Sequence, residues 1–271
     1  MKKIIENNIS LRLIAVLVVC LTLMTGCASV SAAMVTKEIN LSGFDTVNIG
    51  GSWDATVTQG AQYKIVVTAP EEYIDSVCTL DSGKLSVQSP NSGWSWLKFW
   101  DTSSFYGRNK IQITAPDMKN IKLSGSITGI VSGFKNLMMQ IASSGSSDLS
   151  VTDCAVQKMS IDCSGSSDVA IAQSVLIDLT VDCAGSSKIN AKTCTVNNLS
   201  LDVTGSSRFT FTEGNVVNLS VKLFGSSDVL INKMNGGKMT GNMSGSSNLT
   251  YSGTISGYDI ESSGSSKVRS Q

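Results

Sequence analysis

The C-terminal half of the chain alternates apolar and polar residues on both sides of a recurring Gly-Ser-Ser tripeptide. Between Met159 and Ile171, apolar side chains occupy every second position up to and beyond the turn at Gly165. An alternation with period two is typical of strands that bury one face, and helical spacing does not fit it. The pattern therefore predicts two short strands joined by a sharp turn in each repeat.

The tripeptide recurs at a nearly fixed interval, which indicates a solenoid. Its glycines follow one another in steps of 20 residues with a last step of 19, and Gly125-Ser126 lies one step further upstream as a degenerate copy. We predict an all-β fold in which 125–271 form a right-handed parallel β-helix or solenoid with coils about 4.8 Å apart. The glycines are Gly145, Gly165, Gly185, Gly205, Gly225, Gly245 and Gly264.

Residues at the same offset from the glycine should form inward columns that run through the stack. Each large side chain that is fully buried in this way contributes roughly 1.5–3 kcal/mol. Glycine permits the positive φ of a sharp corner, and the serines can bond to the local backbone. The alternative is that the serines form an outward ladder for a ligand. Three of the columns begin Met159-Leu179-Leu199, Ile161-Val181-Leu201 and Val169-Ile189-Phe209.

Residues 37–124 carry strand patterns but no repeat of this length. Turn residues, among them Gly50-Gly51, separate the candidate strands. The open end of a solenoid needs a cover, because bare strand edges invite pairing with other chains. We therefore expect this region to begin the β-structure and to cap it. The candidate strands are 46–49, 55–59, 63–69, 84–88 and 110–115.

The N-terminus has the pattern of an export signal. Basic residues precede an apolar run at 13–21 that is too short to span a membrane comfortably. The run leads to Leu23-Met24-Thr25-Gly26-Cys27, which resembles a bacterial lipobox. We predict a signal peptide at 1–26, lipidation of Cys27 and a tether at 27–36. The acyl chains would anchor the protein to the outer membrane, on its periplasmic side or at the cell surface. The alternative is ordinary cleavage near Ala33.

Charge and composition exclude several classes of function. Lys plus Arg and Asp plus Glu number 21 each, which gives no electrostatic reason to expect nucleic-acid binding. The absence of histidine removes the usual general base, the commonest zinc ligand and any Ser-His-Asp triad. We expect no catalytic residues, no cofactor and no metal site. Lyase chemistry that uses Lys, Arg or Asp stays open.

An aromatic segment, 93–107, interrupts the N-terminal region and holds three of the four tryptophans. Aromatic side chains on a loop suit stacking on a glycan, contact with a protein partner or contact with a membrane. The alternative is that they fold over the end of the solenoid as a hydrophobic lid. The candidate ligand-binding residues are Trp94, Trp96, Phe99, Trp100, Phe105 and Tyr106.

Two outward columns of charged residues are also expected. Asp162, Asp182 and Asp202 lie three positions before the glycine, where three stacked carboxylates could bind calcium or simply face solvent. A second column, three positions after the glycine, mixes both signs and indicates an ordinary solvated surface. It consists of Asp148, Asp168, Lys188, Arg208 and Asp228.

The cysteines other than Cys27 are interpreted as small buried hydrophobic residues. Cys163 and Cys183 share an inward position on neighbouring coils, but stacked Cβ atoms point the same way, which is an awkward geometry for a disulfide. Cys154 and Cys194 share an offset two coils apart, which is too far to bridge. The spacing gives no zinc or redox motif.

Several segments resemble a known family. The runs 42–47 and 51–60, with Trp53 in the second, look like the opening of the autotransporter-adhesin head GIN domain. The strand that ends at Pro116 and the run 121–126 also match that family. The resemblance covers roughly 38–268 and implies an exported, β-helix-like protein of the kind common among Bacteroidetes lipoproteins. It supplies no catalytic residues.

Three functions follow from these features. The first is a non-enzymatic binding, adhesin-like or scaffold module of the cell envelope, whose ligand is a glycan or a protein. The second is a polysaccharide lyase, for which Asp182 and Asp202 beside Arg208 are the only candidate residues. The third is a scaffold that self-assembles end to end through the last coil, where Lys267 and Arg269 border an open strand edge.

Overall fold

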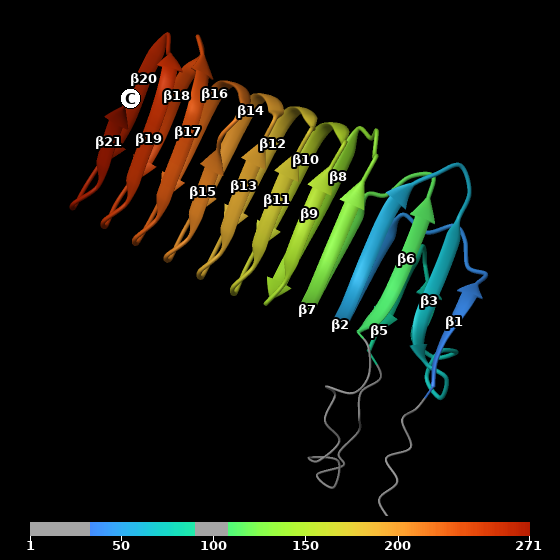
Figure 1. Ribbon diagram of the computed structural model, residues 1–271. Coiled ribbons are helices and arrows are strands. Elements are labelled where there is room, and N and C mark those ends of the chain that lie inside the picture. The colour runs from blue at the N-terminus through green and yellow to red at the C-terminus, as the bar shows by residue number, and fades with distance from the viewer. Residues whose placement is uncertain (1–32, 90–107) are drawn as a thin grey trace, which may run out of the picture.

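The computed structural model describes residues 33–89 and 108–271. These residues form 21 strands and no helix, and all the strands belong to one hydrogen-bonded sheet that coils upon itself. Figure 1 shows the coils stacked side by side from β7 to β21, with β1 to β6 at the opposite end of the stack. The predicted all-β parallel solenoid is confirmed.

Two series of parallel strands form the two faces of the solenoid, and each strand pairs with the strand one coil further on. The first face consists of β8 (Met138–Gly145), β10 (Ala155–Cys163), β12 (Val175–Cys183), β14 (Cys194–Val203), β16 (Gly214–Leu223), β18 (Lys238–Met243) and β20 (Gly257–Ser262). The second face consists of β9 (Asp148–Thr152), β11 (Asp168–Ala172), β13 (Lys188–Lys192), β15 (Arg208–Phe211), β17 (Asp228–Asn235), β19 (Asn248–Thr254) and β21 (Lys267–Ser270).

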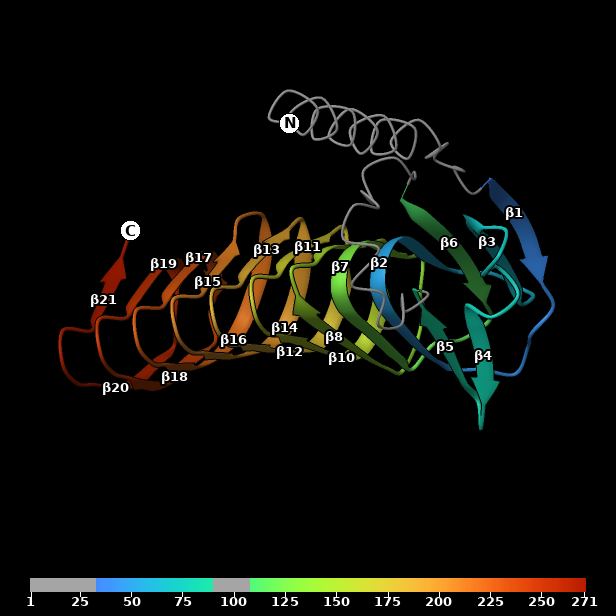
Figure 2. The ribbon, with the colours of Figure 1, turned by 90° about the horizontal axis from the view of Figure 1, so that it is seen from below.

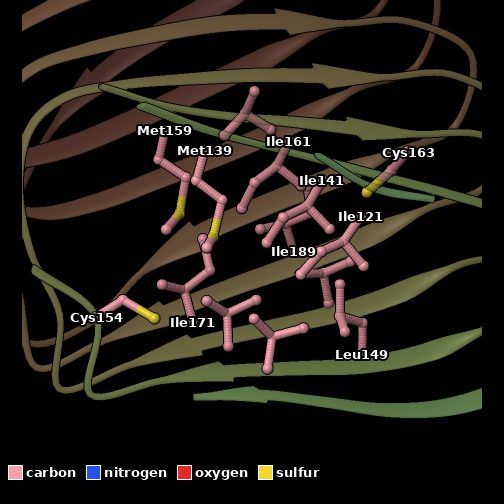
Figure 3. Close-up of a cluster of buried hydrophobic side chains, with 14 of the residues drawn as sticks. Ile121, Met139, Ile141, Leu149, Cys154, Met159, Ile161, Cys163, Ile171 and Ile189 are labelled. Atoms are coloured by element: carbon pink, nitrogen blue, oxygen red, sulfur yellow. The ribbon is translucent and has the colours of Figure 1, made fainter. Parts of the chain in front are cut away.

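The inward columns fill the space between the faces, as the alternation predicted. Ile161 pairs with Val181 and Val181 with Leu201, so like stacks on like. All three are at most 1% exposed, and Figure 3 shows such side chains converging from both faces. Burial fails only in the outermost coils, where Tyr251 and Val268 are half-buried. The core is therefore one continuous apolar column.

The Gly-Ser-Ser corners have the geometry that glycine alone permits. Gly185 has a φ of +87°, and a Cβ built there would lie 2.7 Å from the carbonyl oxygen of Gly165 in the preceding coil. The second serine of every tripeptide except the last is buried, and Ser187 donates its hydroxyl to the Ala184 carbonyl at 3.2 Å. The corner interpretation is confirmed: these glycines pack directly on one another from coil to coil.

The first coil of the stack lies before the repeat that the sequence shows. β2 (Thr46–Gln59) runs parallel to β7 (Asn120–Ser132) in unbroken register, with Gly51 opposite Gly125 and Trp53 opposite Ile127. The strand continues through Gly50-Gly51, where the pattern predicted a turn, because the glycines form a corner inside one pairing ladder. Trp53 is fully buried, and its indole Nε1 donates to the Gly50 carbonyl at 3.1 Å.

The other N-terminal strands extend this first coil. β3 (Lys64–Pro70) pairs antiparallel with β1 (Met34–Ile39) on one side and with β6 (Asn109–Ala115) on the other. β4 (Cys78–Asp81) and β5 (Lys84–Gln88) form a hairpin whose second strand pairs with β2. Figure 2 shows the group around one end of the solenoid. β1 and β4 were not predicted, and β1 begins at Met34, within the predicted tether.

Candidate functional site

The predicted lipidation and ligand-binding residues lie outside the described part of the chain. They are Cys27, Trp94, Trp96, Phe99, Trp100, Phe105 and Tyr106. Ser89 and Arg108, the described residues on either side of 90–107, both contact β2 beside its corner glycines. We call this place the first-corner site and define it by Gly50, Ser52, Asp54, Ser89 and Arg108.

On the incoming side of the segment, backbone hydrogen bonds hold Ser89 against the corner. Its N–H donates to the Gly50 carbonyl at 3.0 Å, and its hydroxyl accepts from the N–H of Ser52 at 3.0 Å. These contacts exist because β5 ends beside the first half of β2, where Gly50 pairs with Gln88. The chain therefore enters the segment at the outside of the first corner.

On the outgoing side, the guanidinium of Arg108, one residue before β6, connects β2 with β7. Its Nε lies 3.1 Å from Asp54 Oδ1 on β2, Nη1 donates to Thr128 Oγ1 at 2.9 Å, and Nη2 donates to the Ser126 carbonyl at 3.2 Å on β7. The side chains of Arg108 and Asp54 are 45% and 37% exposed, so the network lies at the surface. The two described residues that flank 90–107 are thus both held against β2.

The aspartate column on the first face is formed as predicted. Asp162, Asp182 and Asp202 are direct neighbours in the parallel register. Desolvation by burial raises the pKa of Asp182, and repulsion from the carboxylates on either side adds to the effect. The column borders a shallow open groove of about 250 Å³. Within the described ranges, no three His, Cys, Asp or Glu residues are placed to hold a metal ion.

An amide column on the same face was not predicted. The Asn198 side-chain amide donates to Asp178 Oδ1 at 2.7 Å, and Asn218 donates in the same way to Asn198 Oδ1 at 2.9 Å. The backbone N–H of Lys238 then donates to Asn218 Oδ1 at 3.0 Å. All four residues lie seven positions before a corner glycine, so their shared offset was available in the sequence. These hydrogen bonds link the side chains of Asp178, Asn198 and Asn218 from coil to coil.

The mixed column on the second face forms ion pairs along the solenoid axis. Lys188 lies 4.0 Å from Asp168, and Arg208 Nη2 lies 3.1 Å from Asp228 Oδ2. Arg208 therefore extends along the second face to Asp228, whereas Asp182 and Asp202 belong to the first face. The structure therefore places Arg208 on a different face from Asp182 and Asp202, the three residues of the lyase hypothesis.

The five described cysteines are free thiols. Burial raises the pKa of Cys163 to about 12, and it raises the pKa of Cys183 as well. Cys163 and Cys183 stack in register without a bond, and Cys154 and Cys194 are also buried. Figure 3 shows Cys154 and Cys163 among the apolar side chains of the core. The interpretation as small buried hydrophobic residues is confirmed for these four, whereas Cys78, which it also covered, is only half-buried.

This arrangement suits binding better than covalent chemistry. The outward columns present carboxylates, amides and hydroxyls that recur coil after coil, about 4.8 Å apart. An extended ligand that lies along the axis would meet the same groups repeatedly on a rigid surface. Within residues 33–89 and 108–271 there is no helical segment with the length and hydropathy needed to cross a bilayer.

The fold and its surface define a parallel β-solenoid with polar columns on both faces. The family model described as "Putative auto-transporter adhesin, head GIN domain" matches residues 43–223. The chain belongs to this family, which confirms the resemblance found in the sequence. No curated protein matches the chain in sequence.

Several solved structures share the fold at low sequence identity. A "putative lipid binding protein" from Parabacteroides distasonis has a TM-score of 0.74 at 20% identity, and the match covers 89% of this chain and 98% of that one. A "putative adhesin" from Parabacteroides merdae has a TM-score of 0.67 at 15% identity, with 89% and 97% covered. A "putative adhesin" from Bacteroides fragilis has a TM-score of 0.63 at 16% identity, with 89% and 98% covered.

Proposed function

We propose that this chain is a non-enzymatic lipoprotein of the cell envelope that binds an external ligand on a rigid solenoid. Membership of the adhesin head family supports a binding role at the envelope. The lipobox-like run that ends at Cys27 supports a lipid anchor. Two acyl chains on that cysteine would hold the protein firmly at the membrane, since each buried methylene contributes about 0.8 kcal/mol.

The observation that carries the proposal is that Ser89 and Arg108, on either side of 90–107, both contact the first corner. Ser89 and Arg108 hold the flanking backbone through hydrogen bonds and an ion pair to β2 and β7. A binding segment that stands on a fixed base loses less conformational freedom when its ligand binds. Ser89 and Arg108 flank the stretch of sequence that holds the six aromatic residues, which supports the proposal.

A glycan is the ligand class that this composition fits best. Ring faces of Trp and Tyr stack on the apolar faces of sugar rings, while the indole N–H and phenol groups bond to hydroxyls. The proposed contact residues are Trp94, Trp96, Phe99, Trp100, Phe105 and Tyr106. The polar columns of the first face would then extend the contact along the axis for a polymeric glycan.

The test is a glycan-array screen of residues 28–271 beside a triple variant, Trp94→Ala, Trp96→Ala and Trp100→Ala. The control is Phe224→Ala, which removes an aromatic ring that is 42% exposed on a distant corner. We expect the triple variant to lose binding while its urea unfolding midpoint stays that of the parent, and we expect Phe224→Ala to bind normally.

A second variant tests the anchoring contacts of Arg108 separately from the proposed glycan-contact residues. Arg108→Ala removes the bridge from the segment to Asp54 and Thr128, so it should weaken glycan binding by a smaller factor than the triple variant. If neither the parent nor any variant binds a glycan and the triple variant unfolds more easily, the segment is a lid. The glycan proposal would then be abandoned in favour of a protein ligand.

The anchor has a test of its own. Cys27→Ser should shift the protein from the detergent-soluble membrane fraction to the aqueous fraction and abolish incorporation of labelled fatty acid. Cys78→Ser is the matched control, because Cys78 lies within the folded part of the chain. Unchanged fractionation of Cys27→Ser would contradict the lipoprotein proposal without affecting the glycan test.

A further inference from the structure

The last coil of the solenoid exposes both a strand edge and the end of the apolar core. β20 pairs only with β18, and β21 only with β19, so among the described strands both have a free outer edge. Tyr258 occupies the column position of the buried Met239 but is 53% exposed, and Ile260 and Val268 are half-buried. An uncovered edge beside apolar side chains favours association with another strand pair.

The charges on these two edges have opposite signs. Asp259 and Glu261 point outward from β20, whereas Lys267 and Arg269 point outward from β21, and all four are exposed. None of them takes part in an ion pair in the described part of a single chain. Two copies that each present an edge of one charge sign repel each other. A copy that presents one acidic and one basic edge can instead pair its acidic edge with the basic edge of a second copy.

Within the repeat, Asp259 and Arg269 are the only charged residues that lie five positions from a corner glycine. In the preceding coil, the residues that pair with the two acids are Thr240 and Asn242, and the residues that pair with the two bases are Asn248 and Thr250. These four are uncharged. The last coil therefore carries two acids on β20 and two bases on β21, whereas the coil before it is uncharged at all four positions.

We propose that a second copy of this chain covers the open end in a two-fold dimer, with β20 of each copy paired antiparallel to β21 of the other. The two-fold axis lies in the end plane and passes through the corner at Gly264. Because β20 leads into this corner and β21 leads away from it, the axis places each strand against the other in opposite directions. Such an interface uses the same patch on both copies.

The spacing from the corner matches the two strands residue by residue. Glu261 and Lys267 both lie three residues from Gly264, and Asp259 and Arg269 both lie five residues from it. The proposed axis therefore sets each acid opposite a base. Cross-strand pairs of opposite charge contribute roughly 0.2–1 kcal/mol each, and like charges destabilise by similar amounts.

The same axis also covers the apolar core. Ile260 and Val268 lie four residues from the corner on either side, so each would lie opposite the other across the interface. The alternative two-fold arrangement, which sets β20 on β20 and β21 on β21, would bring acid to acid and base to base. Charge therefore selects the first arrangement. The contact involves two short strands per copy, so the dimer should be weak and concentration-dependent.

The test is sedimentation equilibrium of residues 28–271 with two charge-reversal variants. One variant is Lys267→Glu with Arg269→Asp, and the other is Asp259→Arg with Glu261→Lys. We expect the parent to dimerise and each variant alone to dimerise at least about tenfold more weakly, which is about 1.4 kcal/mol. An equimolar mixture of the two variants should form a heterodimer, because each edge then again meets the opposite sign.

The mixture makes the test independent of folding defects, since a misfolded variant cannot regain a partner. A matched control reverses Lys122 and Lys158, which are exposed on inner coils, and should dimerise like the parent. A parent that stays monomeric up to about 1 mM would overturn the proposal. So would variants that dimerise as well as the parent, or a mixture that fails to associate.

Discussion

The solenoid and the N-terminal region build one core by different rules. From β7 onward, every strand pairs in parallel with the strand one coil away, and residues at equal offsets stack from coil to coil. Before β7, parallel and antiparallel pairs meet around β2, which contacts β5, β6 and β7. The repeat needs only local periodicity, whereas the N-terminal region depends on strand pairs that are distant in the sequence.

This difference teaches how a solenoid end can be closed. At the N-terminal end, β1, β3 and β6 add antiparallel strands to the first coil, and large residues such as Trp53 and Phe44 are completely buried there. At the C-terminal end, the last coil keeps the geometry of its predecessors, and Tyr258 is more than half exposed. The asymmetry makes one end a cap, whereas at the other end the outer edges of β20 and β21 are unpaired among the described strands.

The strongest test of this comparison is to remove one large side chain from each region. Trp53→Ala should lower the free energy of unfolding by about 3–5 kcal/mol, and Phe209→Ala in the solenoid should lower it by a similar amount. Because β2 and β7 pair over their full length, we expect both variants to shift one shared transition. Guanidinium unfolding followed by circular dichroism and by tryptophan fluorescence measures this. Separate transitions for the two probes would show that the regions fold independently.

Replacement of a turn glycine by alanine should have a smaller effect on the free energy of unfolding. Gly133 and Gly185 both have positive φ, +81° and +87°, but a Cβ at Gly133 meets nothing within 4 Å, whereas one at Gly185 lies 2.7 Å from a carbonyl oxygen. Gly133→Ala should cost about 1–2 kcal/mol for the backbone conformation alone. Gly185→Ala should cost at least about 1 kcal/mol more, because backbone must move. Equal losses in urea unfolding would mean that the corners do not pack as tightly as described.

The smallest effect concerns the aspartate column, and its sign depends on pH. Because burial and neighbouring carboxylates raise the pKa of Asp182, the folded state holds a proton that the unfolded state releases. Stability therefore falls as pH rises from the ordinary aspartate range through the raised pKa of Asp182. Asp182→Asn should add less than about 1 kcal/mol at neutral pH and nothing at pH values below that range.

A control for this prediction comes from the second face. Asp228 accepts from Arg208 and Asn248, so Asp228→Asn should leave stability unchanged or reduce it at neutral pH. Thermal unfolding of both variants at acidic and neutral pH compares the two columns directly. A loss of stability in Asp182→Asn at neutral pH would show that the carboxylate binds a partner instead of repelling its neighbours.

The sequence was sufficient to predict the regular part of the fold. A parallel in-register stack places residues at equal offsets on top of one another, so columns such as Ile161-Val181-Leu201 could be derived by counting from the glycines. The outward charged columns followed from the same count. The corner geometry followed from the chemistry of glycine.

The parts that were missed have physical reasons. β2 belongs to the stack, but the long insertion 60–119 separates Gly51 from its counterpart Gly125 and hides the period. Each coil also turns between its second-face strand and the next first-face strand. In three coils this turn has a positive φ at Asp153, Gln173 or Thr193, and these unlike residues give no common sequence signal for it. The anchoring by Arg108 depends on pairing of β2 with both β6 and β7, which no local pattern reveals.

The glycine column at the corners also determines how such a protein can change in length over generations. Each corner glycine rests on the carbonyl of its predecessor, from Gly125 to Gly264, although the last interval is one residue shorter than the others. The intervening loops therefore absorb small insertions and deletions, while the corner itself does not. Unequal recombination that adds or removes a whole coil restores the column at once. The length of the rod can accordingly evolve in steps of one coil, without redesign of its interior.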